Sequence, residues 1–256
     1  MADLINKEKI KHGLEPALDA LLNDSLAAAG PKGATLISAA LYGSAATQDY
    51  SAGRSDVNVF FVFDRIALPL LQALRDVFKK HFKRLRSNPV VLDAEYFEDS
   101  RDVFPMEFLE WKEKSIVFFG EDLLKDLEIS GGNLRLEIEE NLRGKRMRLI
   151  QSYFEMDPRR RQLQPFLLGT LPNFIVVGRN ILRLMDAAVS EDVNSMLGAL
   201  ERKAGVEMPT FKRLVRVKHE NLKVGAAEIE IMFKEFLVEI DRLIVFIDKF
   251  KAGKVE

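Results

Sequence analysis

The feature that most constrains the fold is a pair of apolar segments, residues 34–41 and 57–63, separated by a polar loop. The first segment is rich in small apolar residues. The second carries β-branched and aromatic residues on both faces, as expected of a strand at the centre of a sheet. The pair therefore predicts two strands of a sheet that is covered on both sides.

The remaining segments divide the chain into two parts. In the first part, periodicity predicts helices over residues 5–29 and 68–85, short strands over residues 89–92 and 115–119, and a mostly helical stretch over residues 93–114. Gly131-Gly132 marks a boundary, and no convincing strand follows it. Helical runs are predicted over residues 133–156, 159–188, 191–203 and 210–219, with interruptions at Pro165 and Pro172.

The last helix shows the clearest pattern, with apolar residues alternately four and three positions apart, which is typical of a helix packed in a bundle. Its seam consists of Ile229, Phe233, Phe236, Ile240, Leu243, Ile247 and Phe250. The fold class expected is therefore α+β: a mixed sheet with flanking helices over residues 1–128, followed by an all-helical bundle domain over residues 129–256.

Composition excludes several classes of protein and of site. The net charge of −1 gives no basic field for nucleic acid or an anionic membrane, so neither is expected as a partner. There is no Cys and there are only three His, which argues against thiolate or His-based metal centres. The N-terminus lacks an apolar signal core, and the apolar runs fall short of the ~18 residues that a membrane span requires. A cytoplasmic location is expected.

Polar residues with chemical potential lie between the two central strands. Gly43-Ser44 follows the first strand, and Ser55-Asp56-Val57-Asn58 leads into the second. A glycine allows the backbone to approach a phosphate closely, and the N–H groups of a helix beginning there would favour an anion. Asp56 and Asn58 are two residues apart, so on a strand they would share a face and offer oxygen ligands to Mg²⁺.

This order of residues resembles the signature of the DNA polymerase β-like nucleotidyltransferase superfamily, in which Gly-Ser is followed by a loop and then Asp-x-Asp. The two-part layout resembles that of the bacterial kanamycin- and streptomycin-type aminoglycoside nucleotidyltransferases. The resemblance implies that Gly43, Ser44 and Ser55 bind the nucleotide and that Asp56 and Asn58 are catalytic and metal-binding. Asn58 departs from the pattern, because it lacks the charge of the usual Asp and should weaken the second of two Mg²⁺ sites.

The family also uses a third carboxylate from a later strand. Asp93 and Glu95 are the candidates here, and Asp93 is the residue assigned to the metal. Asp93 also stands where a strand ends and a helix begins, so the competing interpretation is an N-cap.

Two functions are therefore expected from the sequence. The first is a Mg²⁺-dependent nucleotidyltransferase that moves a nucleoside monophosphate, AMP from ATP, to a hydroxyl of a small molecule or a protein. The second is a catalytically degenerate protein of the same fold that acts as a nucleotide-binding or interaction module. The acceptor is not specified by the sequence, and the helical domain is the expected contact surface if the chain forms homo-oligomers.

Charged residues of the second half provide further candidates, each with a plainer interpretation as a solvated helix face. The resemblance suggests a base for the acceptor hydroxyl near the helical domain, where Glu137, Glu139 and Glu140 lie. The basic clusters Arg143–Arg148 and Arg159–Arg161 could contact phosphates. The segment Arg213–His219 resembles a degenerate form of the Arg–His pattern of HEPN-family ribonucleases, and its plainer interpretation is a basic helix end.

Overall fold

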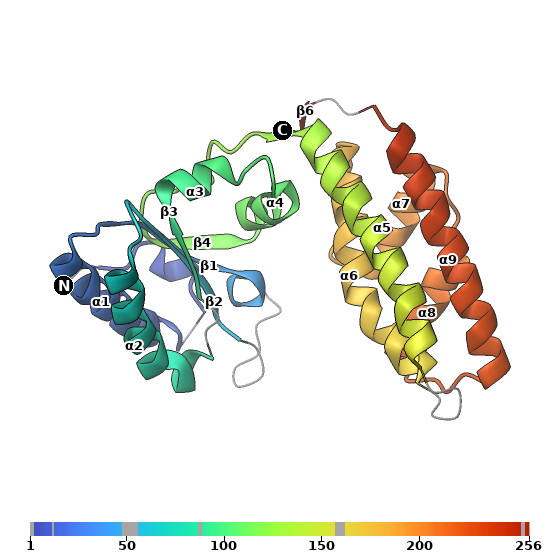
Figure 1. Cartoon of the computed structure of the whole chain (residues 1–256), viewed down its shortest axis with the longest axis horizontal. Helices are drawn as coiled ribbons and strands as arrows, with labels where there is room; N and C mark the ends of the chain where they lie inside the picture. The colour runs from blue at the N-terminus through green and yellow to red at the C-terminus, as the bar shows by residue number, and fades with distance from the viewer. Residues whose placement is uncertain are drawn as a thin grey trace. The chain divides into compact units, whose positions relative to one another are not determined.

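The computed structural model describes residues 3–11, 13–47, 56–86, 89–156, 162–251 and 254–255. The chain divides into two compact units, Met1–Leu127 and Glu128–Glu256, each of which is described by itself (Figure 1). The first is a small mixed sheet with flanking helices and the second is a helical bundle, which confirms the predicted α+β fold class.

The sheet of the first unit has the strand order β3-β2-β1-β4. Its strands are β1 (Leu36–Tyr42), β2 (Asn58–Phe63), β3 (Pro89–Asp93) and β4 (Ser115–Gly120). Strand β1 pairs antiparallel with β2 and with β4, whereas β3 runs parallel to β2. The end of β1 and the starts of β2, β3 and β4 therefore meet at one end of the sheet, which is the end that bears the predicted motif.

Two helices cover one face of the sheet, and two shorter ones cover the other (Figure 1). The four helices are α1 (Glu15–Ala29), α2 (Leu68–Leu85), α3 (Ala94–Asp99) and α4 (Pro105–Glu113). Leu41, Val59 and Phe61 point toward α1 and α2 in one continuous apolar core. On the α4 side, Phe60 stacks against Trp111, with 5.3 Å between ring centroids.

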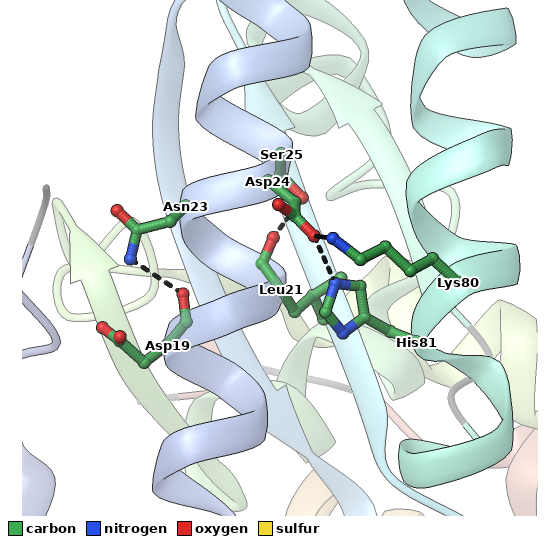
Figure 2. Close-up of polar contacts among 7 residues, drawn as sticks. All are labelled: Asp19, Leu21, Asn23, Asp24, Ser25, Lys80 and His81. Atoms are coloured by element: carbon green, nitrogen blue, oxygen red, sulfur yellow. Dashed lines mark hydrogen bonds and ion pairs between the residues drawn. The ribbon is translucent and has the colours of Figure 1, made fainter.

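Polar side chains join α1 to α2 at the edge of this core. Asp24 Oδ2 on α1 lies 2.7 Å from Lys80 Nζ and 2.7 Å from His81 Nε2, both on α2 (Figure 2). His81 is buried, whereas Lys80 is exposed. The hydrogen bonds from Lys80 and then His81 lower the pKa of Asp24 below its ordinary value, so this carboxylate is charged at neutral pH.

One helix prediction in this unit was too long. The predicted helix over residues 5–29 contains only a short 3₁₀ turn, η1 (Lys7–Lys9), before α1 begins at Glu15. Gly13 adopts the left-handed conformation with φ of 89°, and the proline that follows Glu15 occupies the first turn, where its missing N–H costs nothing. The mostly helical stretch predicted over residues 93–114 contains two helices, α3 and α4, and Pro105 begins the second.

The second unit contains five helices among its described residues: α5 (Gly131–Glu155), α6 (Leu163–Leu184), α7 (Val193–Ala204), α8 (Pro209–His219) and α9 (Ala226–Lys249). The predicted seam of the last helix is buried along α9 except for Phe250, which follows the helix and is half buried. Phe236 of this seam meets Phe174 of α6 and Phe211 of α8. A two-residue pairing of β5 (Ile129–Ser130) with β6 (Lys254–Val255) corrects the expectation that no strand follows residue 130.

Helix α6 runs through both prolines that were predicted to interrupt it. Pro165 falls in the first turn, where backbone N–H groups have no partner within the helix. Pro172 removes the N–H that would bond to the Leu168 carbonyl, and Lys218 Nζ donates to that carbonyl instead at 3.2 Å. Because it is continuous, α6 is the one candidate membrane span among the described residues, with a mean hydropathy of 1.2. It packs against α5, α7, α8 and α9, as the central helix of a bundle does.

Candidate functional site

The predicted glycine lies in a tight turn directly after β1. Gly43 has φ of 67°, a left-handed backbone that side chains disfavour, and it opens a single 3₁₀ turn, η3 (Gly43–Ala46). The turn is closed by a hydrogen bond of 3.2 Å from the Thr47 N–H to the Ser44 carbonyl. A Cβ added at Gly43 would lie 3.3 Å from Nδ2 of Asn58. Both the conformation and the close approach therefore require glycine here.

Asn58 lies across from this turn on the neighbouring strand. It pairs with Tyr42, the last residue of β1. Its neighbours Val57 and Val59 are buried on the α1–α2 side, so Asn58 projects on the opposite face, that of Tyr42 and Phe60. Directly paired side chains share a face, and this register brings the predicted residues Gly43 and Asn58 together.

Asp56 lies just before β2 begins and is half exposed. Its Oδ1 atom lies 3.2 Å from Nε of Arg86. This contact joins the entrance of β2 to the end of α2, where the Val57 N–H also donates to the Leu85 carbonyl at 3.2 Å. The carboxylate predicted to hold a metal ion is therefore paired with a guanidinium in this structure.

Arg86 is the residue of this site that sequence reasoning missed. It caps the C-terminus of α2 in the left-handed conformation, with φ of 47°, and its N–H donates to the Phe82 carbonyl. An arginine just after a helix is a common surface residue, so no sequence signal singled it out. Arg86 becomes a candidate functional residue only because it contacts Asp56 in the folded protein.

Asp93, the predicted third metal ligand, lies away from the other predicted ligands. Strands β2 and β3 are parallel, and Asp93 pairs with Phe63, at the opposite end of β2 from Asn58. Five strand residues separate Asn58 from Phe63, which corresponds to about 16 Å. In addition, Asp93 Oδ1 accepts the Tyr96 N–H at 2.8 Å and so caps α3. Glu95 follows on α3 at the same far end.

The donor set that the described residues provide does not fit a two-metal centre. Among the described residues, no group of three or more His, Cys, Asp or Glu side chains could hold a metal ion. At the Gly43 turn the described donors are one carboxylate, already paired with Arg86, and one neutral amide. Ser55, the remaining predicted nucleotide-binding residue, lies outside the described residues.

Aromatic rings lie beside the turn. Tyr42 is half buried, with its ring centroid 6.3 Å from that of Phe60 and 5.8 Å from that of Trp111. Burial raises the pKa of the Tyr42 phenol above its ordinary value, so the hydroxyl remains protonated at neutral pH. These rings form the wall of the site on the α4 side of the sheet.

The charged candidates of the second unit are used within the bundle. Glu139 pairs with Arg143 and Arg135 at 2.8 Å each, and these partners lower the pKa of its carboxyl group. Arg146 binds Asp241 on α9 through both carboxylate oxygens. These contacts favour the interpretation as bracing helix faces over that as a base or a phosphate clamp.

The remaining basic candidates give no support to a second site. Arg213 pairs with Glu228 of α9, and His219 is exposed at the end of α8. No contact therefore supports the ribonuclease interpretation. The cluster Arg159–Arg161 lies outside the described residues.

Comparison with known proteins gives a weak structural likeness and no match in sequence. No protein-family model matches the sequence, and the curated proteins contain no significant match. Among solved structures, the chain is similar to the spectinomycin adenyltransferase AAD(9) from Enterococcus faecialis, solved with ATP and spectinomycin. The two chains are 14% identical, the alignment covers 88% of this chain and 97% of that one, and the TM-score is 0.46. A likeness at this level does not support an assignment of function, which must come from the residues of the site.

Proposed function

We propose that the first unit binds the phosphate groups of a nucleotide at the Gly43 turn, without the two-metal chemistry of an active nucleotidyltransferase. The observation that carries the proposal is the combination of a left-handed glycine turn with a reduced donor set beside it. Gly43 and Asn58 are packed against each other, whereas Asp56 is paired with Arg86. The signature is thus kept on its phosphate side and altered on its metal side.

The turn has the features that phosphate recognition requires. Its backbone approaches an adjacent strand with no side chain in between, and the first N–H groups of a helical turn have no partner within that turn. The half-buried Ser44 follows directly, and its hydroxyl is an additional donor. A nucleotide is proposed rather than a simple anion because of the signature, with Tyr42 and Trp111 supplying aromatic surface nearby.

The Mg²⁺-dependent transfer of AMP from ATP to a hydroxyl is the second candidate. One observation favours it: Asp56 is 55% exposed and its ion pair with Arg86 lies at the surface. Exposed pairs of this kind contribute about 0–1 kcal/mol, so a divalent cation would lose little by displacing the arginine. A single carboxylate and an amide would then have to suffice for the metal.

Isothermal titration calorimetry with ATP separates the two candidates. The binding module is expected to bind ATP in EDTA as well as in Mg²⁺, because its phosphate contacts do not require the ion. The transferase is expected to bind ATP only with Mg²⁺ or Mn²⁺, and to transfer label from ATP to an acceptor in a manner that Asp56→Ala abolishes. If ATP binds in neither condition, the proposed function is wrong.

A further inference from the structure

We propose that Arg86 replaces the divalent cation at this site, moving its guanidinium from Asp56 to a phosphate of the bound nucleotide. The inference rests on the proposed nucleotide binding and names the residue that makes it independent of metal. Its basis is that the guanidinium of Arg86 contacts the carboxylate of Asp56, the residue that would bind metal in the resembled family.

The guanidinium is held at this position by the backbone around it. Arg86 ends α2 in the left-handed conformation, and the preceding Leu85 carbonyl accepts the Val57 N–H at 3.2 Å. These contacts fasten the end of α2 to the entrance of β2. Arg86 and Asp56 therefore face each other because of the fold, and the ion pair of 3.2 Å follows from that placement.

The pair is suited to exchange. The side chains of Arg86 and Asp56 are 53% and 55% exposed, so their mutual attraction is screened by water and easily given up. Arginine presents a planar fork of donors that matches two oxygens of a phosphate, and a hydrogen bond between two charged groups is stronger than one between neutral groups. A phosphate arriving at the Gly43 turn would thus compete successfully with Asp56 for the guanidinium.

Under this proposal Asp56 weakens nucleotide binding, whereas a metal ligand would strengthen it. Without a metal ion, its carboxylate repels the phosphates and competes with them for Arg86. Asp56→Asn is therefore expected to preserve or strengthen ATP binding in EDTA. If Asp56 were instead a metal ligand required for binding, the same change would weaken ATP binding in Mg²⁺.

The test measures ATP affinity of the full chain by calorimetry in EDTA at fixed ionic strength. Arg86→Asn removes the charge with a residue that tolerates the left-handed backbone, so folding is expected to survive. We expect ATP binding to weaken about ten- to hundredfold, the loss that corresponds to one charge-assisted hydrogen bond. Arg86→Lys keeps the charge but not the fork and should lie in between.

A matched control lies on the same helix. Arg75 is 61% exposed and also forms an ion pair of 3.2 Å with a neighbouring carboxylate, that of Asp76. It lies eleven residues before Arg86, about 16 Å along a helix. Arg75→Gln is therefore expected to leave ATP affinity unchanged, which shows that a change at Arg86 is not an effect of net charge alone.

The outcomes distinguish this inference from the proposed function beneath it. Weakened binding in Arg86→Asn, with Arg75→Gln and Asp56→Asn at least as tight as the wild type, supports the inference. Wild-type affinity in Arg86→Asn overturns it and leaves the proposed nucleotide binding intact. ATP binding that requires Mg²⁺ and is lost in Asp56→Asn also overturns it, and no ATP binding by the wild type in either condition overturns both.

Discussion

The charged residues of the helical bundle differ in use from those at the motif-bearing end of the sheet. In the helical bundle, charges brace one helix against another: Arg146 binds Asp241 across α5 and α9. Glu239 is 3% exposed and accepts the Thr210 and Phe211 N–H groups at the start of α8. Burial raises the pKa of Glu239 above its ordinary value despite these bonds. Glu239 contributes to stability, because replacing its side chain leaves the buried Thr210 and Phe211 N–H groups at the start of α8 without an acceptor.

In the sheet unit, the polar residues at one end of the sheet remain accessible. Asp56 and Arg86 are each more than half exposed, and Asp56 leads into the strand whose first residue, Asn58, approaches the Gly43 turn. The comparison teaches that the charged side chains described above for the bundle hold its helices together, whereas those at this end of the sheet remain exposed to solvent. The following predictions test that division, using the single Trp111 of the sheet unit as a local fluorescence probe.

The largest expected effect is a cavity in the bundle. Phe236 is fully buried and its ring contacts those of Phe174 and Phe211, so Phe236→Ala should cost about 3–5 kcal/mol of unfolding free energy. Helix loss followed by circular dichroism should shift to lower denaturant, while the Trp111 transition stays in place. Ile231→Ala, at a 57% exposed position of the same helix, is the control and should change little. A parallel shift of the Trp111 transition would break the comparison, because the units would then unfold together.

The second effect falls on the sheet unit. Gly120 has φ of 74°, and a Cβ there would lie 1.9 Å from the Ile37 carbonyl oxygen. Gly120→Ala must therefore displace the β1–β4 pairing and should cost at least about 2 kcal/mol, with left-handed strain supplying part of that cost. The Trp111 transition should move and most of the helical signal should not. The matched control is Gly144 in α5, where a Cβ meets nothing, so Gly144→Ala should be neutral or stabilise by about 0.5–1 kcal/mol.

The smallest effect concerns the ion pairs between α1 and α2. The pKa of Asp24 is lowered in the folded state, chiefly by Lys80 and then by His81, so folding favours its charged form (Figure 2). The stability that this supplies is complete well above pH 3.8, the ordinary value, and is lost as the pH falls through the lowered value. Asp24→Asn should thus cost about 1 kcal/mol at pH 7 and less at pH 3.

The control for this change is Asp19→Asn on the same helix. The hydrogen bond that Asp19 makes there uses its backbone carbonyl, which accepts from Asn23 Nδ2, and the substitution leaves that bond in place (Figure 2). Chemical denaturation at the two pH values provides the measurement. Equal costs at pH 7 and pH 3 would show that the charge of Asp24 plays no part in holding α1 to α2.

Local pattern was sufficient to predict elements whose environment is uniform. The seam of α9 is apolar at helical spacings, whereas residues 57–63 form a short run of β-branched and aromatic residues, which favours a strand. Prolines were harder to interpret, since their effect depends on position within a helix. Pro105 starts a helix, whereas Pro172 lies inside one and its freed carbonyl is satisfied by Lys218 from a different helix.

The candidate site divides in the same way. Gly43, Asp56 and Asn58 could be named from the sequence, because a glycine turn and an Asp-x-Asn entering a strand are local patterns. The third carboxylate could not, since the parallel pairing of β3 with β2 decides which end of the sheet Asp93 occupies, and it places that residue at the far end. Arg86 could not be found either, because its significance depends on where the end of α2 packs.

By itself, the sequence determined the α+β plan, the glycine turn and the loss of one charge at Asn58, all of which depend on neighbours along the chain. Only the tertiary structure decided that Asp93 caps a helix and that Arg86 faces Asp56. The physical reason is that strand direction and helix packing bring together residues distant in sequence. The net charge of the site depends on residues from several segments, so it cannot be derived from any single segment of the chain.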